Sequence, residues 1–316
     1  MTFSQEVKNE ILKSARNLSG GNATSFLAAV LKSAGSLVID FDGFAFCLDS
    51  DNADLLALCQ KFAQAEFNSQ VEIVTHDKKA KRQPAYTCTF PLEVGQGLGL
   101  ASRDGDGSFC LCDDASALIP NEPAAKRSFL QGLFVAGGSV VIPMLNEEEH
   151  WSNTLNTKYH LELRFTDEAF AAAVAESFSE LQFRTLSRKT HVVLYLKDSD
   201  RIADFLVFVN ATSASFALEN VKISRSIRNK YNRANNCEIG NIGKTVKAAG
   251  EQLQAIATLR QKGMFDTLPD PLKDIALLRE QNNEATLDEI ADVLHISKSG
   301  ASHRFAKLIE LSQRKN

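Results

Sequence analysis

The chain has 316 residues, of which 44% are hydrophobic and 23% are charged, and its formal net charge at pH 7 is −4. These proportions are typical of a globular protein with enough length for two or three domains. No apolar run is long enough to cross a membrane and no secretory signal is present, so we expect a cytoplasmic protein without a membrane partner. The six cysteines are scattered and fit no zinc site, and we expect neither a metal nor another cofactor.

The N-terminal half of the chain contains an internal repeat. After a predicted helix over residues 4–17, the segment FLAAVLKSAGSLVI (residues 26–39) returns 103 residues later as FLQGLFVAGGSVVI (residues 129–142). Each copy is an apolar helix rich in small residues that runs into Gly-Ser and then a β-branched strand. Small side chains let two helices approach closely, so the repeat predicts two packed helices in a pseudo-twofold domain.

The segments that follow the two copies have the same predicted order of elements. In each half, the initial helix is followed by two strands, a helix, two strands and a further helix. This order predicts an α+β domain over residues 1–215, with repeats at about 20–115 and 125–215 and an extended antiparallel sheet. Residues 95–120 are rich in Gly, Asp and Ser, and they favour a hairpin and a linker between the repeats.

Residues 216–263 are expected to form a basic linker followed by a helix over residues 245–262. Residues 216–250 contain seven Lys or Arg against two Glu, although the whole chain is negative. Basic side chains interleaved with Asn, Ser and Tyr suit contacts with nucleic-acid phosphates. The candidates for such contacts are Arg225, Arg228, Lys230 and Arg233. A linker that is merely solvated is an equal alternative.

The C-terminal segment, residues 264–316, contains the pattern of two short helices joined by a tight turn. Thr286 and Glu289 have the spacing of a capping box, which begins the first of these helices. Ser297 is placed to cap the second helix. An earlier helix is predicted to begin with Asp270 as N-cap and Pro271 at its first position. The three helices would share a small core of their own.

The second helix of this pair has an apolar face and a polar face. Ala301, Phe305 and Leu308 can pack inward, while hydroxyl, imidazole and basic side chains point elsewhere. Such a helix, held across a short turn, suits the major groove of DNA, although a plain helical hairpin with a solvated face is the alternative. The candidate DNA-binding residues are Thr286, Ser297, Lys298, Ser299, Ser302, His303, Arg304 and Lys307.

Five segments in this order resemble the WhiA family, bacterial regulators in which a domain similar to LAGLIDADG homing endonucleases precedes a helix-turn-helix domain. They are FLAAVLKSAGS, FLQGLFVAGGSV, KYHLELRF, NRANNCEIGNIGKTVKAA and SKSGASHRFAKL, and they cover nearly the whole chain. The resemblance implies an α+β pseudo-twofold LAGLIDADG-like domain, αββαββα repeated, followed by an all-α helix-turn-helix domain. The chain departs from the family at Ser302, where Asn is usual, and at Ala301, where a larger apolar residue is usual.

The resemblance also implies a function. It implies a sequence-specific DNA-binding transcriptional regulator linked to cell division, chromosome segregation and, in sporulating relatives, sporulation. The expected partner is double-stranded DNA at the nucleoid, with other transcription factors or division proteins as further candidates. Lys298, Ser299, Ser302 and His303 would approach base edges, and Arg304 and Lys307 would contact phosphates.

The LAGLIDADG resemblance implies that the nuclease site is missing. In those nucleases the last acidic residue of each motif binds the catalytic metals, and here Ala34 and Gly137 occupy the two positions. The other acidic position of the motif is Lys32 in one copy and Val135 in the other. We therefore expect no enzyme activity. The alternatives are an interaction scaffold of the division machinery or nucleoid with weak DNA binding, a ligand-responsive regulator, and an active homing endonuclease.

Overall fold

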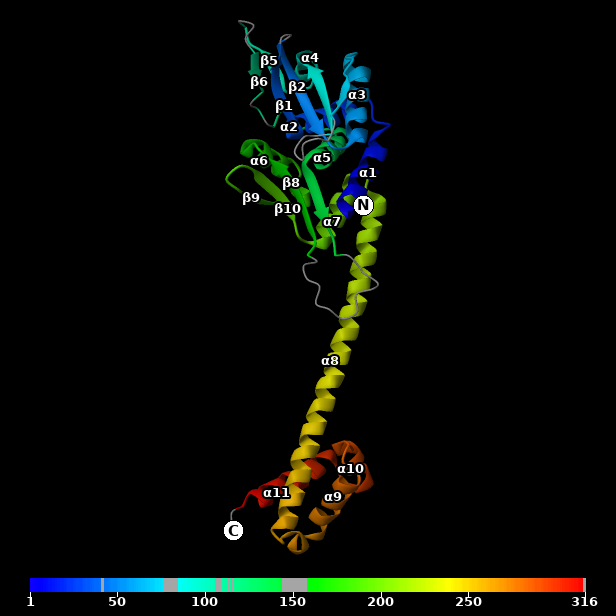
Figure 1. Ribbon diagram of the computed structural model, residues 1–316, viewed down its shortest axis with the longest axis vertical. Helices are drawn as coiled ribbons and strands as arrows, with labels where there is room; N and C mark the ends of the chain where they lie inside the picture. The colour runs from blue at the N-terminus through cyan, green and yellow to red at the C-terminus, as the bar shows by residue number, and fades with distance from the viewer. Residues whose placement is uncertain are drawn as a thin grey trace. The chain divides into compact units, whose positions relative to one another are not determined.

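The computed structural model describes residues 1–40, 43–76, 85–105, 109–112, 114, 116–143 and 158–314 (Figure 1). The chain divides into two compact units, Met1–Ser224 and Arg225–Asn316. Each unit contains a separate cluster of buried hydrophobic side chains, so each has a core of its own. None of the described helices is both long and apolar enough to span a membrane.

The first half of unit 1 has the predicted order of elements. Its helices and strands are α1 (Phe3–Ala15), α2 (Gly21–Ala34), β1 (Gly35–Asp40), β2 (Gly43–Ser50), α3 (Ala53–Phe67), β3 (Ile73–Thr75), β4 (Tyr86–Pro91), α4 (Leu92–Gly97), β5 (Ala101–Arg103) and β6 (Phe109–Leu111). Asn52 caps α3 by accepting hydrogen bonds from the backbone N–H groups of Asp54 and Leu55. The predicted hairpin between the repeats is β5 paired with β6.

The second half of unit 1 repeats this order. Its elements are α5 (Pro123–Gly137), β7 (Gly138–Val141), β8 (His160–Phe165), α6 (Glu168–Ser177), η1 (Ser179–Leu181), β9 (Arg184–Ser187), β10 (Val192–Leu196) and α7 (Ser199–Phe208). The registers also correspond, since Gly35 faces Leu48 in the first half and Gly138 faces Leu163 in the second. The pseudo-twofold α+β architecture predicted from the repeat is therefore confirmed.

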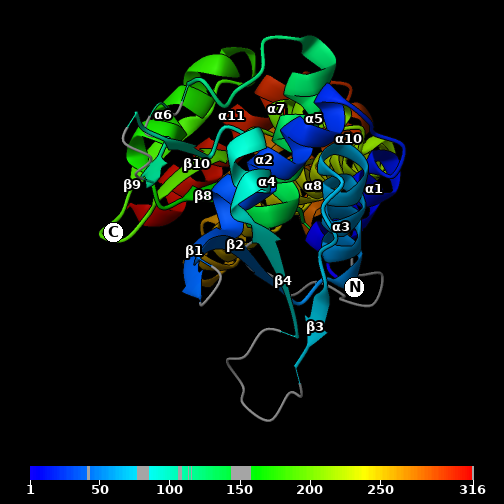
Figure 2. The same cartoon turned by 90° about the horizontal axis from the view of Figure 1, so that it is seen from above.

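Apart from the β5–β6 hairpin, the described strands form two separate sheets of four, and the expectation of one extended sheet is wrong. The strand orders are β1-β2-β4-β3 and β7-β8-β10-β9, and Figure 2 shows the first order clearly. Each sheet packs on helices of its own repeat, and the two halves are joined by α2 against α5. Pairing within each half is visible in the sequence pattern, whereas the pattern does not specify whether strands of different halves also pair.

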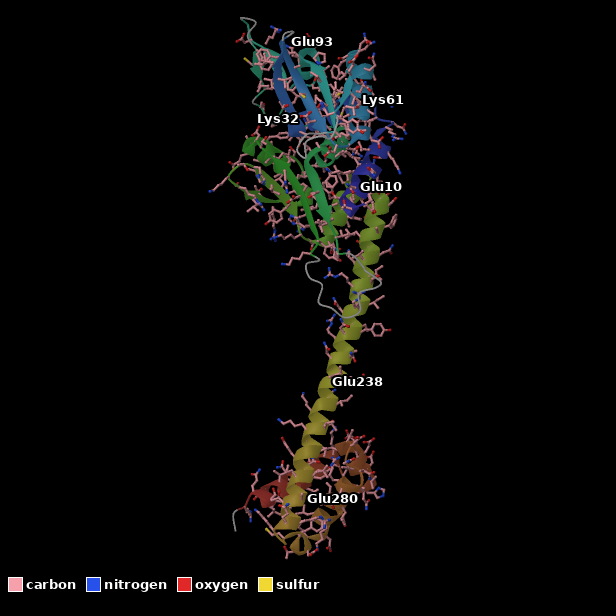
Figure 3. The ribbon with its side chains drawn as sticks, in the orientation of Figure 1. Glu10, Lys32, Lys61, Glu93, Glu238 and Glu280 are labelled. Atoms are coloured by element: carbon pink, nitrogen blue, oxygen red, sulfur yellow. The ribbon has the colours of Figure 1, made fainter. Side chains whose placement is uncertain are left out.

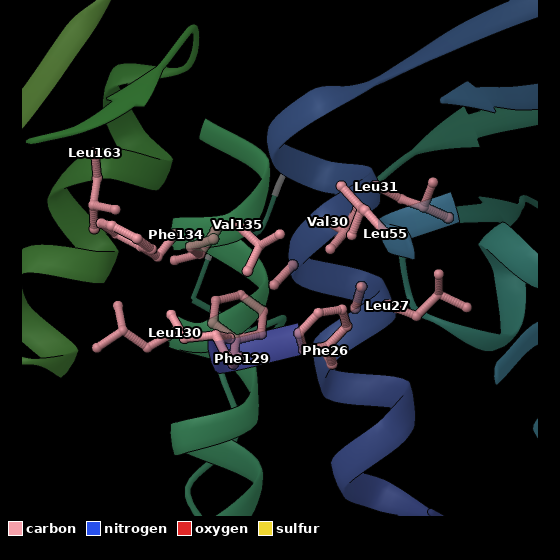
Figure 4. Packing of buried hydrophobic residues seen from close by; sticks show 14 of the residues in the cluster. Phe26, Leu27, Val30, Leu31, Leu55, Phe129, Leu130, Phe134, Val135 and Leu163 are labelled. Atoms are coloured by element: carbon pink, nitrogen blue, oxygen red, sulfur yellow. The ribbon is translucent and has the colours of Figure 1, made fainter. Parts of the chain in front are cut away.

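The interface between α2 and α5 brings the two helix backbones into direct contact. Phe26 of α2 and Phe129 of α5 are fully buried and face each other across it (Figure 4). A Cβ atom added to Gly132 would lie 2.5 Å from the carbonyl oxygen of Phe26 and 2.9 Å from the Cβ of Ala29. The contact therefore requires a residue without a side chain at this position.

The substitution Gly132→Ala should destabilise unit 1. The added methyl group meets backbone, which cannot rotate away, so the helices must separate at a cost of about 1–3 kcal/mol. Native-state hydrogen exchange of the α2 and α5 amides would measure the loss. Gly21→Ala in α2 is the matched control, because a Cβ there has nothing within 4 Å. If the α2 and α5 amides exchange at the same rates in both variants, the helices do not require the missing side chain at Gly132.

A single helix, α8 (Thr212–Gln261), replaces the linker expected over residues 216–244 and crosses the division between the units. Its first N–H groups are satisfied by α1, because Glu10 accepts hydrogen bonds from the backbone N–H of Ser213 at 2.7 Å and of Ala214 at 3.0 Å (Figure 3). Asn and Gly residues lower helix propensity in this stretch, but it contains no proline to interrupt the hydrogen-bond ladder.

Unit 2 is completed by η2 (Phe265–Thr267), α9 (Asp270–Gln281), α10 (Leu287–Val293) and α11 (Lys298–Gln313). Pro269 precedes the first residue of α9, so Asp270 lies within the helix rather than at its N-cap. The core extends beyond the three predicted helices, because Ile256 and Leu259 of α8 are fully buried in it. Arg260 of α8 also pairs with Glu280 of α9, at 2.7 Å between Nη2 and Oε2.

Candidate nucleic-acid interface

The start of α10 is fixed by the predicted capping box. The Thr286 hydroxyl accepts from the backbone N–H of Glu289 at 3.3 Å. The Glu289 carboxylate in turn accepts from the Thr286 backbone N–H at 2.7 Å and from its hydroxyl at 2.9 Å. These hydrogen bonds hold the pKa of Glu289 below its ordinary value. The Thr286 hydroxyl is therefore used within the protein both as a donor and as an acceptor.

The turn between α10 and α11 is short and closely held. His295 adopts a left-handed conformation with φ of 52°, and the Ile296 backbone N–H donates to the carbonyl of Ala291 at 2.9 Å. Ser297 then begins α11, because its hydroxyl accepts from the backbone N–H of Gly300 at 3.1 Å. The predicted cap at Ser297 is thus confirmed, and the two helices are joined by a fixed connection.

The two faces of α11 differ as the sequence predicts. Ala301, Phe305 and Leu308 are buried against the rest of unit 2. Ser302 and His303 are exposed, and neither has a hydrogen-bond partner within the part of the chain that the structure describes. Their donors and acceptors are therefore available to a ligand.

The basic side chains of this surface have weak partners. Lys298 pairs with Asp288 of α10 at 2.6 Å, and Lys307 pairs with Glu310 at 2.8 Å. Arg304 donates to the carbonyl of Pro271 at 3.4 Å. Exposed ion pairs contribute about 1 kcal/mol or less and weaken with salt, so a stronger anion can displace these carboxylates.

Arg279 is a structural residue that the sequence analysis did not identify. It lies on the inner face of α9 with 1% of its surface exposed, and burial lowers its pKa. Its Nε donates to the Gln252 side chain at 2.9 Å and its Nη1 to the carbonyl of Ala285 at 2.5 Å. Its guanidinium lies 5.2 Å from the ring centre of Phe305. Arg279 therefore ties α8 and α11 to the segment that precedes α10.

The position of Arg279 could have been found from helical spacing. Leu272, Ile275 and Ala276 define the inner face of α9, and Arg279 continues it at seven residues from Leu272. A charged side chain at an inward position either has buried acceptors or disrupts the core. Here the acceptors are backbone carbonyls and an amide oxygen.

The substitution Arg279→Met should destabilise unit 2 by about 2–3 kcal/mol, because it leaves the buried Gln252 side-chain oxygen and the partly buried carbonyl of Ala285 without a donor. Thermal unfolding and hydrogen exchange of the α10 and α11 amides would report the change. Lys273→Met on the same helix is the control, since the Lys273 ion pair is long, at 4.0 Å, and its Asp270 partner is exposed. If Arg279→Met is as stable as the control, Arg279 does not organise this unit.

The four candidate phosphate ligands lie on α8 rather than on a linker. Arg225 is partly buried and has a partner within the protein, whereas Arg228, Lys230 and Arg233 are exposed. Arg233 also donates to the carbonyl of Asn229 at 3.2 Å. The helix places Arg225 near Arg228 and Lys230 near Arg233, each pair three residues apart, but the four do not share one face.

Two family models match the chain. The model for the WhiA LAGLIDADG-like domain matches residues 126–228, and that for the WhiA C-terminal HTH domain matches residues 231–312. The chain is 33% identical to the "Probable cell division protein WhiA" of Staphylococcus carnosus (strain TM300), over 99% of this chain and 97% of that protein. The chain belongs to the WhiA family. The protein of the same description from Staphylococcus haemolyticus (strain JCSC1435) is 32% identical over the same shares.

The fold of the WhiA family is confirmed by a solved structure. The crystal structure of full-length DUF199/WhiA from Thermatoga maritima matches with a TM-score of 0.54 and 21% sequence identity, over 100% of this chain and 99% of that one. The chain thus has a LAGLIDADG-like α+β domain and a C-terminal helical helix-turn-helix region.

In this WhiA-family chain the motif positions that would carry acids have other roles. Ala34 and Gly137 are the last residues of α2 and α5, and neither has an oxygen ligand in its side chain. Lys32 pairs across the repeats with Asp167, the N-cap of α6, at 3.3 Å. Its ammonium also lies 5.4 Å from the ring centre of Phe170. Lys32 therefore joins α2 of the first repeat to α6 of the second through an ion pair and a cation–π contact.

Proposed function

We propose that this protein is a sequence-specific DNA-binding transcriptional regulator without nuclease activity, and that α11 reads the major groove. The observation that carries the proposal is the outer face of α11, where Ser302 and His303 are exposed and unpartnered on a helix whose start is fixed by Ser297. A hydroxyl and an imidazole can each donate or accept at base edges. The absence of acidic residues in α11 before Glu310 favours approach to phosphates.

The proposed contacts divide into two groups. Ser302, His303, Ser299 and Lys298 approach base edges. Arg304 and Lys307 bind phosphates, as Lys307 exchanges Glu310 for the DNA backbone. Thr286 and Ser297 act indirectly, since their hydroxyls cap α10 and α11 and so position the reading helix.

Further phosphate contacts are proposed for Arg225, Arg228, Lys230 and Arg233 of α8. Their spread around the helix suits contacts that increase affinity without specifying sequence. The missing acids at Ala34 and Gly137 support the absence of cleavage, because two-metal hydrolysis requires carboxylates at such positions.

The proposed cellular role follows from the family. Relatives that align with nearly the whole chain are described as probable cell division proteins. We infer a regulator at the nucleoid that acts in cell division and chromosome segregation and, in sporulating relatives, in sporulation. A scaffold of the division machinery with weak DNA binding is the competing function, and it would not require the free donors on α11.

The double variant Ser302→Ala with His303→Ala should lose sequence discrimination. Duplexes selected from a randomised library would be compared with scrambled duplexes by fluorescence anisotropy. Loss of two base contacts should lower the affinity ratio by about tenfold or more, while binding to scrambled DNA is maintained by phosphate contacts.

Gln281→Ala is the matched control, since Gln281 is an exposed residue at the end of α9. The proposal requires this variant to have the same ratio of affinities for selected and scrambled duplexes as the unchanged protein. If the double variant and the control have equal affinity ratios for selected and scrambled duplexes, the scaffold function is favoured instead.

A further inference from the structure

A cavity of about 500 Å³ lies in unit 1 where the C-terminal ends of α2 and α5 meet α1 and β8. Its lining includes Lys8, Ser33, Gly137, Glu162, Arg164 and His191. We call it the repeat-end cavity. It lies beside Gly137, one of the two motif positions that lack a metal-binding acid, and DNA reading by α11 does not involve it.

Lys8 brings an uncompensated charge to the repeat-end cavity. It lies on α1 next to the fully buried Val7, and burial lowers its pKa. No carboxylate partner is present for it within the part of the chain that the structure describes. A partly buried ammonium without a counter-ion is costly to maintain, and a bound anion would offset that cost.

Ser33 adds an unused hydroxyl. Its Oγ is shielded from solvent and has no hydrogen-bond partner among the described residues. A Cβ added to Gly137 would lie 3.1 Å from this oxygen, so the glycine leaves space directly beside the hydroxyl. Unpaired buried polar groups are rare in folded proteins, and this one can donate to a ligand in the cavity.

The carboxylate in the lining, Glu162, is already neutralised. Its Oε1 accepts from Arg164 Nη2 at 2.8 Å and from the Ser139 hydroxyl at 3.3 Å, and its Oε2 lies 3.3 Å from His160 Nε2. Burial acts to raise the pKa of Glu162, but the hydrogen bonds from Arg164 and His160 outweigh it and hold this pKa below its ordinary value. Lys8 and the remaining donors of Arg164 and His191 therefore give the cavity a net attraction for anions.

We propose that the repeat-end cavity binds a phosphate group through Lys8, with Arg164, His191 and the Ser33 hydroxyl as further donors. An ammonium, a guanidinium and a hydroxyl together suit the charge and the several acceptor oxygens of phosphate. The volume accommodates a nucleotide-sized molecule. A free phosphorylated metabolite and a backbone phosphate of DNA share this chemistry, and the two sources are separable by experiment.

Equilibrium dialysis of the full chain against radiolabelled inorganic phosphate, with ionic strength fixed by sodium chloride, tests the proposal. We expect saturable binding of one phosphate per chain, weakened at least tenfold by Lys8→Met. Lys13→Met is the control, because Lys13 is an exposed residue of the same helix and does not line the cavity. Equal phosphate affinity in these two variants would overturn the proposal.

A second variant tests the proposal even if Lys8→Met does not fold. Ser33→Ala removes the unpartnered hydroxyl, so it should leave the protein at least as stable by thermal unfolding while it weakens phosphate binding. A merely structural Ser33 would show the opposite pattern, with reduced stability and unchanged binding, and that result would contradict the proposed hydroxyl contact.

The source of the phosphate is determined by competition. If adenosine monophosphate binds more tightly than inorganic phosphate and a duplex does not displace it, the natural ligand is a free phosphorylated metabolite. If a duplex displaces phosphate and binds Lys8→Met more weakly than Lys13→Met, the natural ligand is a backbone phosphate of DNA. If the unchanged protein binds neither phosphate nor adenosine monophosphate saturably, and the duplex binds both variants equally, the cavity is not a phosphate site.

Discussion

The contact of α2 with α5 at Gly132 determines how unit 1 is built. Because the two helix backbones touch there, the helix ends that follow are brought together, and each sheet begins directly after its helix at Gly35 or Gly138. The same geometry in a nuclease would place two acids close enough to hold metal ions. In this chain it places Ala34, Gly137 and the cross-repeat pair of Lys32 with Asp167. The LAGLIDADG-like fold is therefore present without acidic side chains at these two positions.

Unit 2 depends on a buried arginine, Arg279, that has no carboxylate partner among the residues that the structure describes. Arg279 donates to the carbonyl of Ala285, which directly precedes the capping box of α10, and to Gln252 of α8. Thr286 and Ser297 then fix the starts of the two helices. Hydroxyls in α10 and α11 thus serve two purposes. Those of Thr286 and Ser297 cap the helix starts and so position α11, whereas that of Ser302 is exposed on the outer face of α11.

The sequence predicted correctly those helices and strands that depend on residues close together in the chain. The repeat gave the order of helices and strands in both halves, and the spacing of Thr286, Glu289 and Ser297 gave both caps. The linker expected over residues 216–244 from its basic and polar composition is instead part of α8. Asn and Gly lower helix propensity there, but no proline interrupts the helix. Propensity is a weak guide when a long ladder of backbone hydrogen bonds is uninterrupted.

Features that depend on contacts between distant segments could not be read from the sequence. Separation of the two sheets depends on packing between helices from different repeats. The repeat-end cavity combines Lys8, Ser33 and Arg164 from three elements. Ser33 and Arg164 lie in two of the segments that resemble the family, but their spacing in the sequence does not show that they meet Lys8. Arg279 is an intermediate case, since its inward position follows from helical spacing but its partners, Gln252 and Ala285, do not.

The most direct test of the account is the sequence discrimination of unit 2 alone. Residues 225–316 have a separate hydrophobic core, so this segment can be prepared and its helicity checked by circular dichroism. Its affinities for a selected and a scrambled duplex would be measured over a salt series. The account predicts that the folded segment keeps the discrimination ratio of the full chain, with affinities that fall as salt rises. A folded segment that binds both duplexes alike would show that α11 is not the reader.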